Sequence, residues 1–176
     1  MLRTRLAGAV SACLLVAANG HAESPSDVVA TFLSVAGAGD YATAATYFDE
    51  HELAEFRDSI ESFATNTRLF ESIFGADVQS VDSLSDAQFF AVFLEQWFSD
   101  DELAMALGDF TVIGELREDS GLVHVLTRHK FQVGNESFDT INVMQVTDTG
   151  SSPRIAMPPE IEALPAMLRL AYVIPD

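Results

Sequence analysis

Leu122-Val-His-Val-Leu-Thr-Arg-His-Lys-Phe-Gln-Val133 is the stretch of this sequence that decides its fold. It is rich in β-branched and aromatic residues with a period near two, which is typical of a strand with one buried face. The same pattern runs through Phe110–Glu118 before it and Phe138–Thr147 after it. Turn signals at Asp119-Ser120-Gly121 and Gly134-Asn135-Glu136-Ser137 separate the three stretches, so we expect an antiparallel meander.

The register of this meander divides its side chains between two faces. If the hairpins turn on Asp119-Ser120 and Asn135-Glu136, the odd-numbered residues of the central strand face one side. This inner face, which we expect the helices to cover, would hold Phe110, Val112, Leu116, Val123, Val125, Thr127, His129, Phe131, Val133, Phe138, Thr140, Asn142, Met144 and Val146. The outer face would carry Thr111, Glu115, Arg117, His124, Arg128 and Lys130, together with Ile113, Leu126, Ile141 and Val143. That is too apolar for a surface fully exposed to water.

Residues 24–108 predict helices. Ser24-Pro25-Ser26-Asp27 and Ser85-Asp86-Ala87-Gln88 are typical helix starts, and Ser99-Asp100-Asp101-Glu102 has the same capping-box spacing. Apolar residues recurring near every 3.6 positions indicate helices over about 24–37, 40–48 and 51–74. An aromatic stripe, which we interpret as core, follows the start at Ser85; a surface for a partner or an apolar ligand is the alternative. The stripe consists of Phe89, Phe90, Phe93, Trp97 and Phe98.

The chain beyond the meander predicts one more strand and one more helix. The strand is expected at Arg154–Met157, and Pro158-Pro159 opens the helix, with a kink or late start at Pro165. We see no internal repeat, low-complexity segment or linker. We therefore expect a single α+β domain over residues 23–176. Its N-terminal helices would pack on one face of a curved antiparallel sheet of about four strands, with a short C-terminal helix.

The first 22 residues have the layout of a secretory signal peptide. Arg3 and Arg5 precede an apolar run from Leu6 to Ala18, and small residues at Gly20 and Ala22 suit cleavage after Ala22. The apolar run is too short for a membrane anchor, which needs about 20 apolar residues. A lipoprotein signal ending at Cys13 is the other alternative. We therefore expect a periplasmic or secreted protein without stable membrane insertion after cleavage. The mature protein would also have no disulfides, because Cys13 is the one cysteine and lies within the signal peptide.

The charge of the chain limits its partners. The formal net charge is −18, and all 27 acidic residues lie after residue 22. Such a polyanion repels nucleic acid and anionic lipid, since binding to phosphates needs a basic surface. The acidity favours solubility, divalent cations or basic partners. We interpret it as a solvated acidic shell.

Two stretches resemble the nuclear-transport-factor-2-like superfamily, also called cystatin-like α+β cones. Ser24–Leu33 with Gly39–Ala44 looks like its opening helix pair. Thr147–Ile155 looks like its closing turn and strand, with Pro153 where an aromatic residue is common. Residues 51–108 depart from the family pattern because they lack an obvious early strand. The resemblance implies helices on a curved meander, in either enzymes such as ketosteroid isomerases and dehydratases or exported binding domains.

Four polar positions on the expected inner face form the candidate site: Thr127, His129, Thr140 and Asn142. Such a cluster can satisfy its own hydrogen bonds, line a ligand cavity, or use His129 as a general base. We interpret it first as a self-satisfied patch. In the superfamily's isomerases and dehydratases the cavity acid is typically an Asp or a His–Asp pair, whereas the expected register places Asp139 on the outer face.

No metal site or cofactor is expected. His51-Glu52-Leu53-Ala54-Glu55 narrowly misses the zinc-protease motif H-E-x-x-H, because Glu55 stands in place of the second histidine. A cation held by Glu50, His51 and Glu55 is one reading. The other, which we favour, is a solvated first helical turn whose acids complement the helix dipole.

Two functional classes follow from these patterns. The first is an exported, acidic, non-catalytic module that binds an apolar small molecule, another protein or itself. The second is a small cavity-based enzyme of the isomerase or dehydratase type that uses His129. The apolar outer sheet face predicts weak homodimerisation, unless the final helix covers that face.

The signal peptide predicts that the mature protein begins at Glu23. N-terminal sequencing of protein recovered from the periplasm or the medium measures this directly. A lipid-modified Cys13 at the N-terminus would contradict the prediction.

Overall fold

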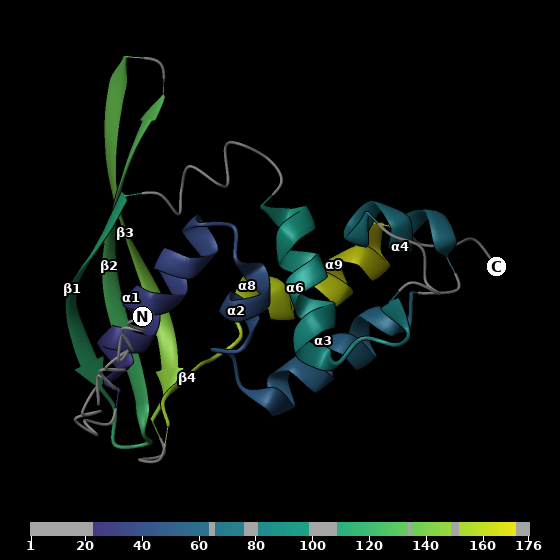
Figure 1. Ribbon diagram of the computed structural model, residues 1–176, viewed down its shortest axis with the longest axis horizontal. Helices are drawn as coiled ribbons and strands as arrows, with labels where there is room; N and C mark the ends of the chain where they lie inside the picture. The colour runs from purple at the N-terminus through teal and green to yellow at the C-terminus, as the bar shows by residue number, and fades with distance from the viewer. Residues whose placement is uncertain are drawn as a thin grey trace, which may run out of the picture.

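The computed structural model describes residues 23–63, 66–75, 81–98, 109–133, 135–148 and 152–171, and shows an α+β fold (Figure 1). Its sheet is open and antiparallel, with the strands in the order β1 (Asp109–Arg117), β2 (Leu122–Val133), β3 (Glu136–Thr147) and β4 (Arg154–Ile155). The expected meander and fourth strand are confirmed. Helices precede the sheet in the chain and short helices follow it, as the sequence predicts.

A β-bulge at Ile113 changes the faces of β1. Val112 pairs with Thr127, but Gly114 already pairs with Leu126, so Ile113 is an extra residue in this strand. Because successive side chains of a strand point to opposite faces, one extra residue reverses every side chain beyond it. The pairing expected from an unbroken strand therefore holds before Ile113 and fails after it.

Because of the bulge, three residues of β1 face the side of the sheet opposite to the one expected from the sequence. Leu116 pairs with His124 on the outer face and is 63% exposed, so its assignment to the inner face was wrong. Glu115 and Arg117 turn to the inner face instead of the outer one, because they pair with Val125 and Val123. The Glu115 carboxylate there accepts a hydrogen bond of 3.0 Å from the Ser26 hydroxyl of the first helix.

The second hairpin is shifted by two residues from the expected register. Val133 pairs with Glu136, so His129 lies opposite Thr140, whereas the sequence predicted Asn142 in that place. Asn142 lies opposite Thr127 instead. A shift of two keeps every side chain on its predicted face, since the side-chain period of a strand is two.

Helix α1 (Pro25–Gly37) packs on the inner face of the sheet and contacts β1, β2 and β4. It begins with the expected Ser24 cap, which the structure extends to a capping box: the side chains of Ser24 and Asp27 each accept a hydrogen bond from the other's backbone N–H. Its buried side chains include Val28, Val29, Phe32 and Leu33. Apolar residues at this spacing form one face of a helix, which explains why α1 lies flat on the strands.

The other helices gather around α6 (Asp86–Trp97), beside the sheet (Figure 1). Helices α2 (Tyr41–Ala45), α3 (Glu50–Glu61) and α4 (Thr67–Phe74) all contact it. The first three members of the aromatic stripe after Ser85 are core, as interpreted from the sequence, because Phe89, Phe90 and Phe93 are fully buried. Trp97 is 40% exposed and Phe98 is half-buried, so the stripe leaves the core at its C-terminal end. The three buried rings pack edge-on or tilted against phenylalanines of α3 and α4. One hydrophobic cluster extends from them to the inner face of the sheet.

The stretch expected as one helix over 51–74 is two helices. α3 ends at Glu61, and α4 begins after Asn66, whose side chain accepts a hydrogen bond of 3.3 Å from the Leu69 N–H. An asparagine cap supplies an acceptor for a free backbone N–H, so it favours a new helix start over continuation.

The C-terminal helix is broken, in agreement with the expected effect of Pro165. α8 (Pro159–Glu162) is followed by α9 (Leu164–Ala171), so Pro165 lies in a first turn, where its missing N–H costs no hydrogen bond. The helix start expected at Ser99 falls outside the described residues. Within the described ranges, no helix has the length and apolar character needed to cross a membrane.

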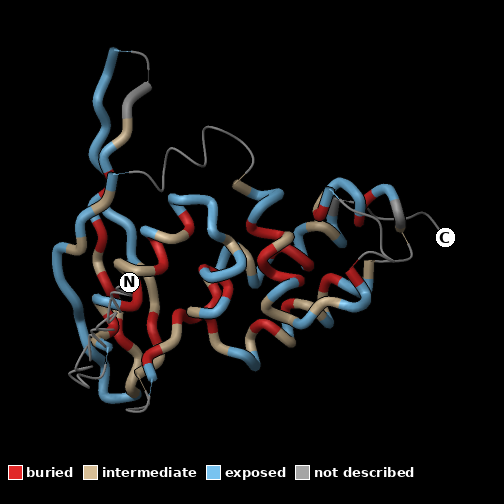
Figure 2. The backbone as a smooth tube through the Cα atoms, in the orientation of Figure 1, coloured by how far each residue is buried: buried red, intermediate tan, exposed pale blue. Residues whose placement is uncertain are grey.

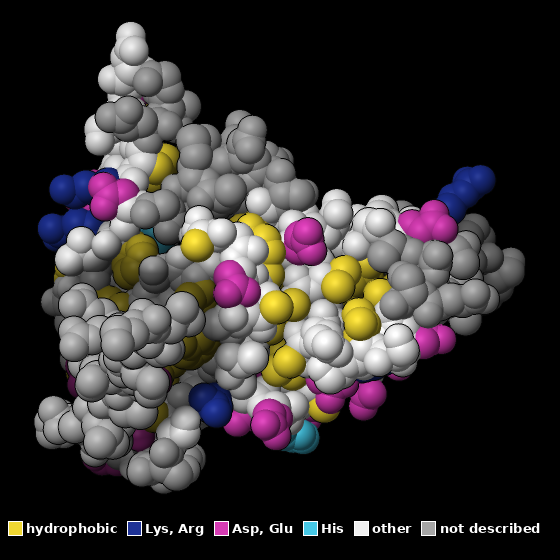
Figure 3. Space-filling view, in the orientation of Figure 1, with side chains coloured by type: hydrophobic (Ala, Val, Ile, Leu, Met, Phe, Trp, Pro, Cys, Tyr) yellow, Lys and Arg dark blue, Asp and Glu magenta, His cyan; other side chains and the backbone are white. Residues whose placement is uncertain are grey.

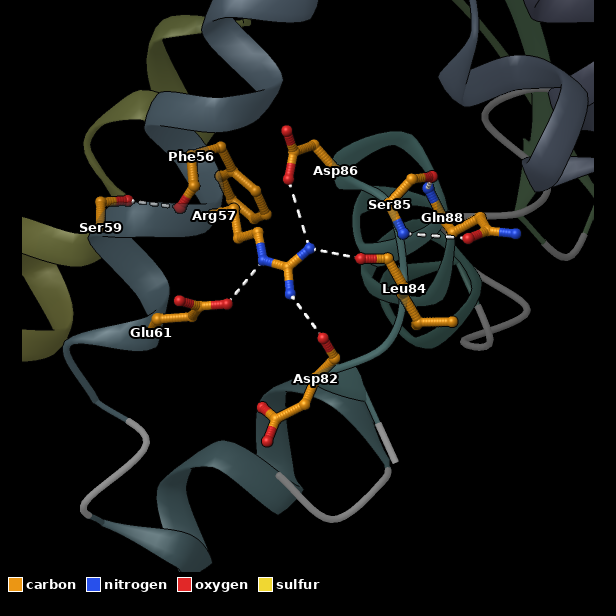
Figure 4. Close-up of polar contacts among 9 residues, drawn as sticks. All are labelled: Phe56, Arg57, Ser59, Glu61, Asp82, Leu84, Ser85, Asp86 and Gln88. Carbon is orange, nitrogen blue, oxygen red and sulfur yellow. Dashed lines mark hydrogen bonds and ion pairs between the residues drawn. The ribbon is translucent and has the colours of Figure 1, made fainter. Parts of the chain in front are cut away.

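Arg57 of α3 joins that helix to the segment leading into α6 (Figure 4). Its side chain is only 15% exposed, and the guanidinium lies over the Phe89 ring at 5.1 Å. Its oxygen partners come from both sides of the junction: Glu61 Oε1 at 2.5 Å, the Leu84 carbonyl at 2.5 Å, Asp86 Oδ1 at 3.3 Å and the Asp82 carbonyl at 3.4 Å. The planar fork of an arginine suits several acceptors held in fixed positions.

Replacing Arg57 by Lys is expected to lower the free energy of unfolding by about 1–3 kcal/mol, because lysine keeps the charge but not the fork. Urea unfolding followed by circular dichroism measures this. Arg68→Lys, at an exposed position of α4, is the control and should change stability by less than about 0.5 kcal/mol. Equal effects of the two substitutions would contradict a junction role for Arg57.

Candidate functional site

Thr127 and His129 are the buried polar pair of the inner sheet face. Their residues are 0% and 5% exposed, and Thr127 Oγ1 lies 2.9 Å from His129 Nε2. The Thr127 hydroxyl also lies 3.5 Å from the Asn142 carbonyl oxygen, at the limit of a hydrogen bond. Across the described part of the chain, no buried side-chain nitrogen or oxygen lacks a hydrogen-bond partner. The Thr127 hydroxyl therefore has its partners within the candidate cluster.

Thr140 and Asn142 are on the same face of the sheet but are exposed. They lie directly opposite His129 and Thr127 on β3, and every residue from Glu136 to Val143 is exposed. Figure 2 shows why: the hairpin formed by β2 and β3 extends beyond the part of the sheet that α1 covers. The structure thus brings Thr127 and His129 together and leaves the side chains of Thr140 and Asn142 at the surface, although the backbone carbonyl of Asn142 approaches the Thr127 hydroxyl.

The surroundings of His129 are aromatic as well as polar. The Phe110 ring of β1 lies 6.2 Å from the imidazole, with the two rings tilted by 37°. A general base must come within hydrogen-bonding distance of the proton that it removes. Because Nε2 of this buried imidazole already faces the Thr127 hydroxyl, a substrate would have to displace that contact to reach it.

A second feature, missed by sequence reasoning, is an acidic hollow between α3 and α8. Its volume is about 280 Å³, and its lining consists of Glu52, Glu55, Phe56, Ser59, Met157, Ile161 and Glu162. Glu52 accepts a hydrogen bond of 2.6 Å from the Met157 backbone N–H. Burial raises the pKa of Glu52, and the nearby carboxylates of Asp49, Glu162 and Glu55 raise this pKa further. No local sequence pattern predicts this hollow, because the residues of its two walls lie about a hundred positions apart in the chain.

The residues of the zinc-motif near miss point in different directions. The imidazole of His51 lies 3.3 Å from the Glu55 carboxylate, in a pair whose side chains are 81% and 68% exposed. Glu52 instead binds the backbone of Met157. Among the described residues, no group of three His, Cys, Asp or Glu side chains is placed to hold a metal ion.

The outer face of the sheet carries an exposed apolar strip, which we call the outer strip and define as Ile113, Leu116, Leu126, Ile141 and Val143. Four of its members are 40–63% exposed, and Leu126 is half-buried at the centre, with Gly114 and Val143 as its neighbours on the two adjoining strands. Sequence reasoning found this strip except for Leu116, which the bulge adds. The start of α8 lies beside one end of the strip, where Val143 and Pro159 line a shared hollow of about 190 Å³. Ile113, Leu116, Ile141 and Val143 nevertheless remain exposed.

Comparison with known proteins provides no relative, because no family model, curated protein or solved structure matches this chain. Its function therefore has to be inferred from its own residues and their geometry.

Replacing His129 by Leu is expected to lower the free energy of unfolding by about 1–3 kcal/mol, because the buried Thr127 hydroxyl loses its nearest partner. Thermal melts of both proteins, with and without lipid extracted from the host, measure this. His51→Leu, at an exposed position, is the control and should melt like the wild type. A small loss of stability combined with loss of a lipid-dependent shift would instead indicate a ligand cavity at His129.

Proposed function

We propose that this protein is an exported, non-catalytic interaction module that binds another protein through its outer strip. The observation that carries this proposal is the exposure of Leu116, Ile141 and Val143 at 63%, 57% and 56% on one sheet face. A monomeric soluble protein rarely leaves a contiguous apolar patch of this kind in water without a use for it.

The shape of the surface favours a protein over a small molecule as the partner. Small-molecule sites are concave and enclose most of the ligand. The outer strip instead lies across β1, β2 and β3 on the side of the sheet opposite α1. Protein interfaces commonly use such open faces, with an apolar centre and a polar rim.

A cavity-based isomerase or dehydratase using His129 is the alternative. The Thr127 contact and the exposure of Thr140 and Asn142 speak for a structural role of this histidine, as described above. The nuclear-transport-factor-2-like resemblance is compatible with either class, because a fold of this kind hosts many functions. Export is the part of the proposal that rests on the sequence pattern of residues 1–22, which lie outside the described residues.

The proposal can be tested by photo-crosslinking in the host organism. A photoreactive amino acid at Val143 is expected to give an adduct of discrete mass in the exported fraction. The same amino acid at Leu170 of α9, which is 79% exposed, is the matched control and should give no such adduct. Absence of any adduct from Val143, Ile141 and Leu116 alike would contradict the proposed interaction surface.

A further inference from the structure

The outer face of the sheet has a charge unlike that of the rest of the molecule. Its strands and first turn carry three basic residues and three acidic ones: Arg128, Lys130 and Arg154, and Asp109, Asp139 and Glu118, whose carboxylate pairs with His124. Arg128 and Asp139 form a loose ion pair of 3.5 Å beside Ile141. This face has no excess of acid, although the chain as a whole carries a formal charge of −18.

The acidic residues are concentrated in the helical part. Helix α3 and its cap hold six carboxylates against one arginine: Asp49, Glu50, Glu52, Glu55, Asp58 and Glu61, and Arg57. Figure 3 shows acidic side chains over the helices, and both basic and acidic side chains at the edge of the sheet. Association through the helical part would therefore bring like charges together.

We propose that the outer strip binds a second copy of this chain, with the two outer faces packed against each other across a two-fold axis. This inference rests on the proposed function and names the partner. Packing these faces places the two acidic helical layers on opposite sides of the pair, where distance and counter-ions weaken their repulsion most. Burial of the apolar strip supplies the attraction.

A second copy of this chain fits the outer face better than a basic protein does. A basic protein would be attracted to the acidic helices, whereas the outer face has no excess of acidic residues to attract it. A two-fold contact requires a self-complementary surface, since the same patch meets itself. A face that carries both Arg128 and Asp139 beside an apolar strip meets this requirement, because each charge can pair with its opposite on the other copy.

Sedimentation equilibrium of the mature protein over a range of concentrations and salt tests the proposal. We expect a monomer–dimer equilibrium that strengthens about tenfold between low and high salt, because salt screens the repulsion between the two acidic bodies. Contacts held mainly by ion pairs would weaken with salt instead. Val143→Lys is expected to abolish the dimer, and Leu170→Lys, the matched control on α9, should leave it unchanged.

The two lysine variants separate surface chemistry from net charge. Each makes the chain less negative by the same amount, so a general charge effect would favour association in both. Val143→Thr keeps the size and β-branching of valine and should weaken the dimer several-fold without affecting the strand. Circular dichroism confirms that each variant is folded.

Several outcomes would overturn the inference. A monomer at every concentration and salt, or equal loss of association in Val143→Lys and Leu170→Lys, would rule out a dimer through this face. A crosslinked adduct at Val143 with a mass other than that of two chains would leave the interaction module standing and make its partner a different protein. A monomer that also gives no adduct would contradict both proposals.

Discussion

The two-residue period of a β-strand is the constraint on which the rest of this structure depends, and the bulge at Ile113 breaks it once. Without the extra residue, Leu116 would lie under the helices and Glu115 would face water. With it, Glu115 reaches Ser26 at the start of α1 and Leu116 extends the outer strip. A single residue thus helps to dock the first helix and enlarges the apolar surface on the opposite face.

The parts of this fold that could be predicted from the sequence are those specified by local patterns. Capping boxes at Ser24 and Ser85 locate two helix starts, and alternating residues locate the strands. The bulge was missed although a glycine inside a strand, here Gly114, often marks one, because the residues on both sides of it still read as a single strand. The exposure of Thr140 and Asn142 escaped it too, because their burial depends on where α1 crosses the sheet, which no local pattern records.

The helical cluster explains how the sheet can keep one face open. Phenylalanines of α3, α4 and α6 form a buried core beside the sheet, and α1 connects this core to the inner face. Apolar burial therefore stabilises the fold without using the outer strip. The same arrangement places the acid-rich helix α3 away from the outer strip.

The raised pKa of Glu52 gives this acidic chain an unusual response to acid. A carboxyl whose pKa is higher in the folded state than in the unfolded state binds its proton preferentially when folded, so protonation favours folding. This contribution is fully present below the ordinary glutamate value of 4.5 and is lost as the pH rises through the raised folded pKa. Asp27 and Asp40 act in the opposite sense, because hydrogen bonds from Ser24 and Thr43 lower the pKa of each carboxyl. The capping carboxylates keep their contribution until the pH falls below their ordinary value of 3.8, whereas Glu52 has gained its own by 4.5. In strongly acidic surroundings Glu52 therefore offsets part of the stability that the capping carboxylates lose, and the acidic hollow contributes to acid tolerance.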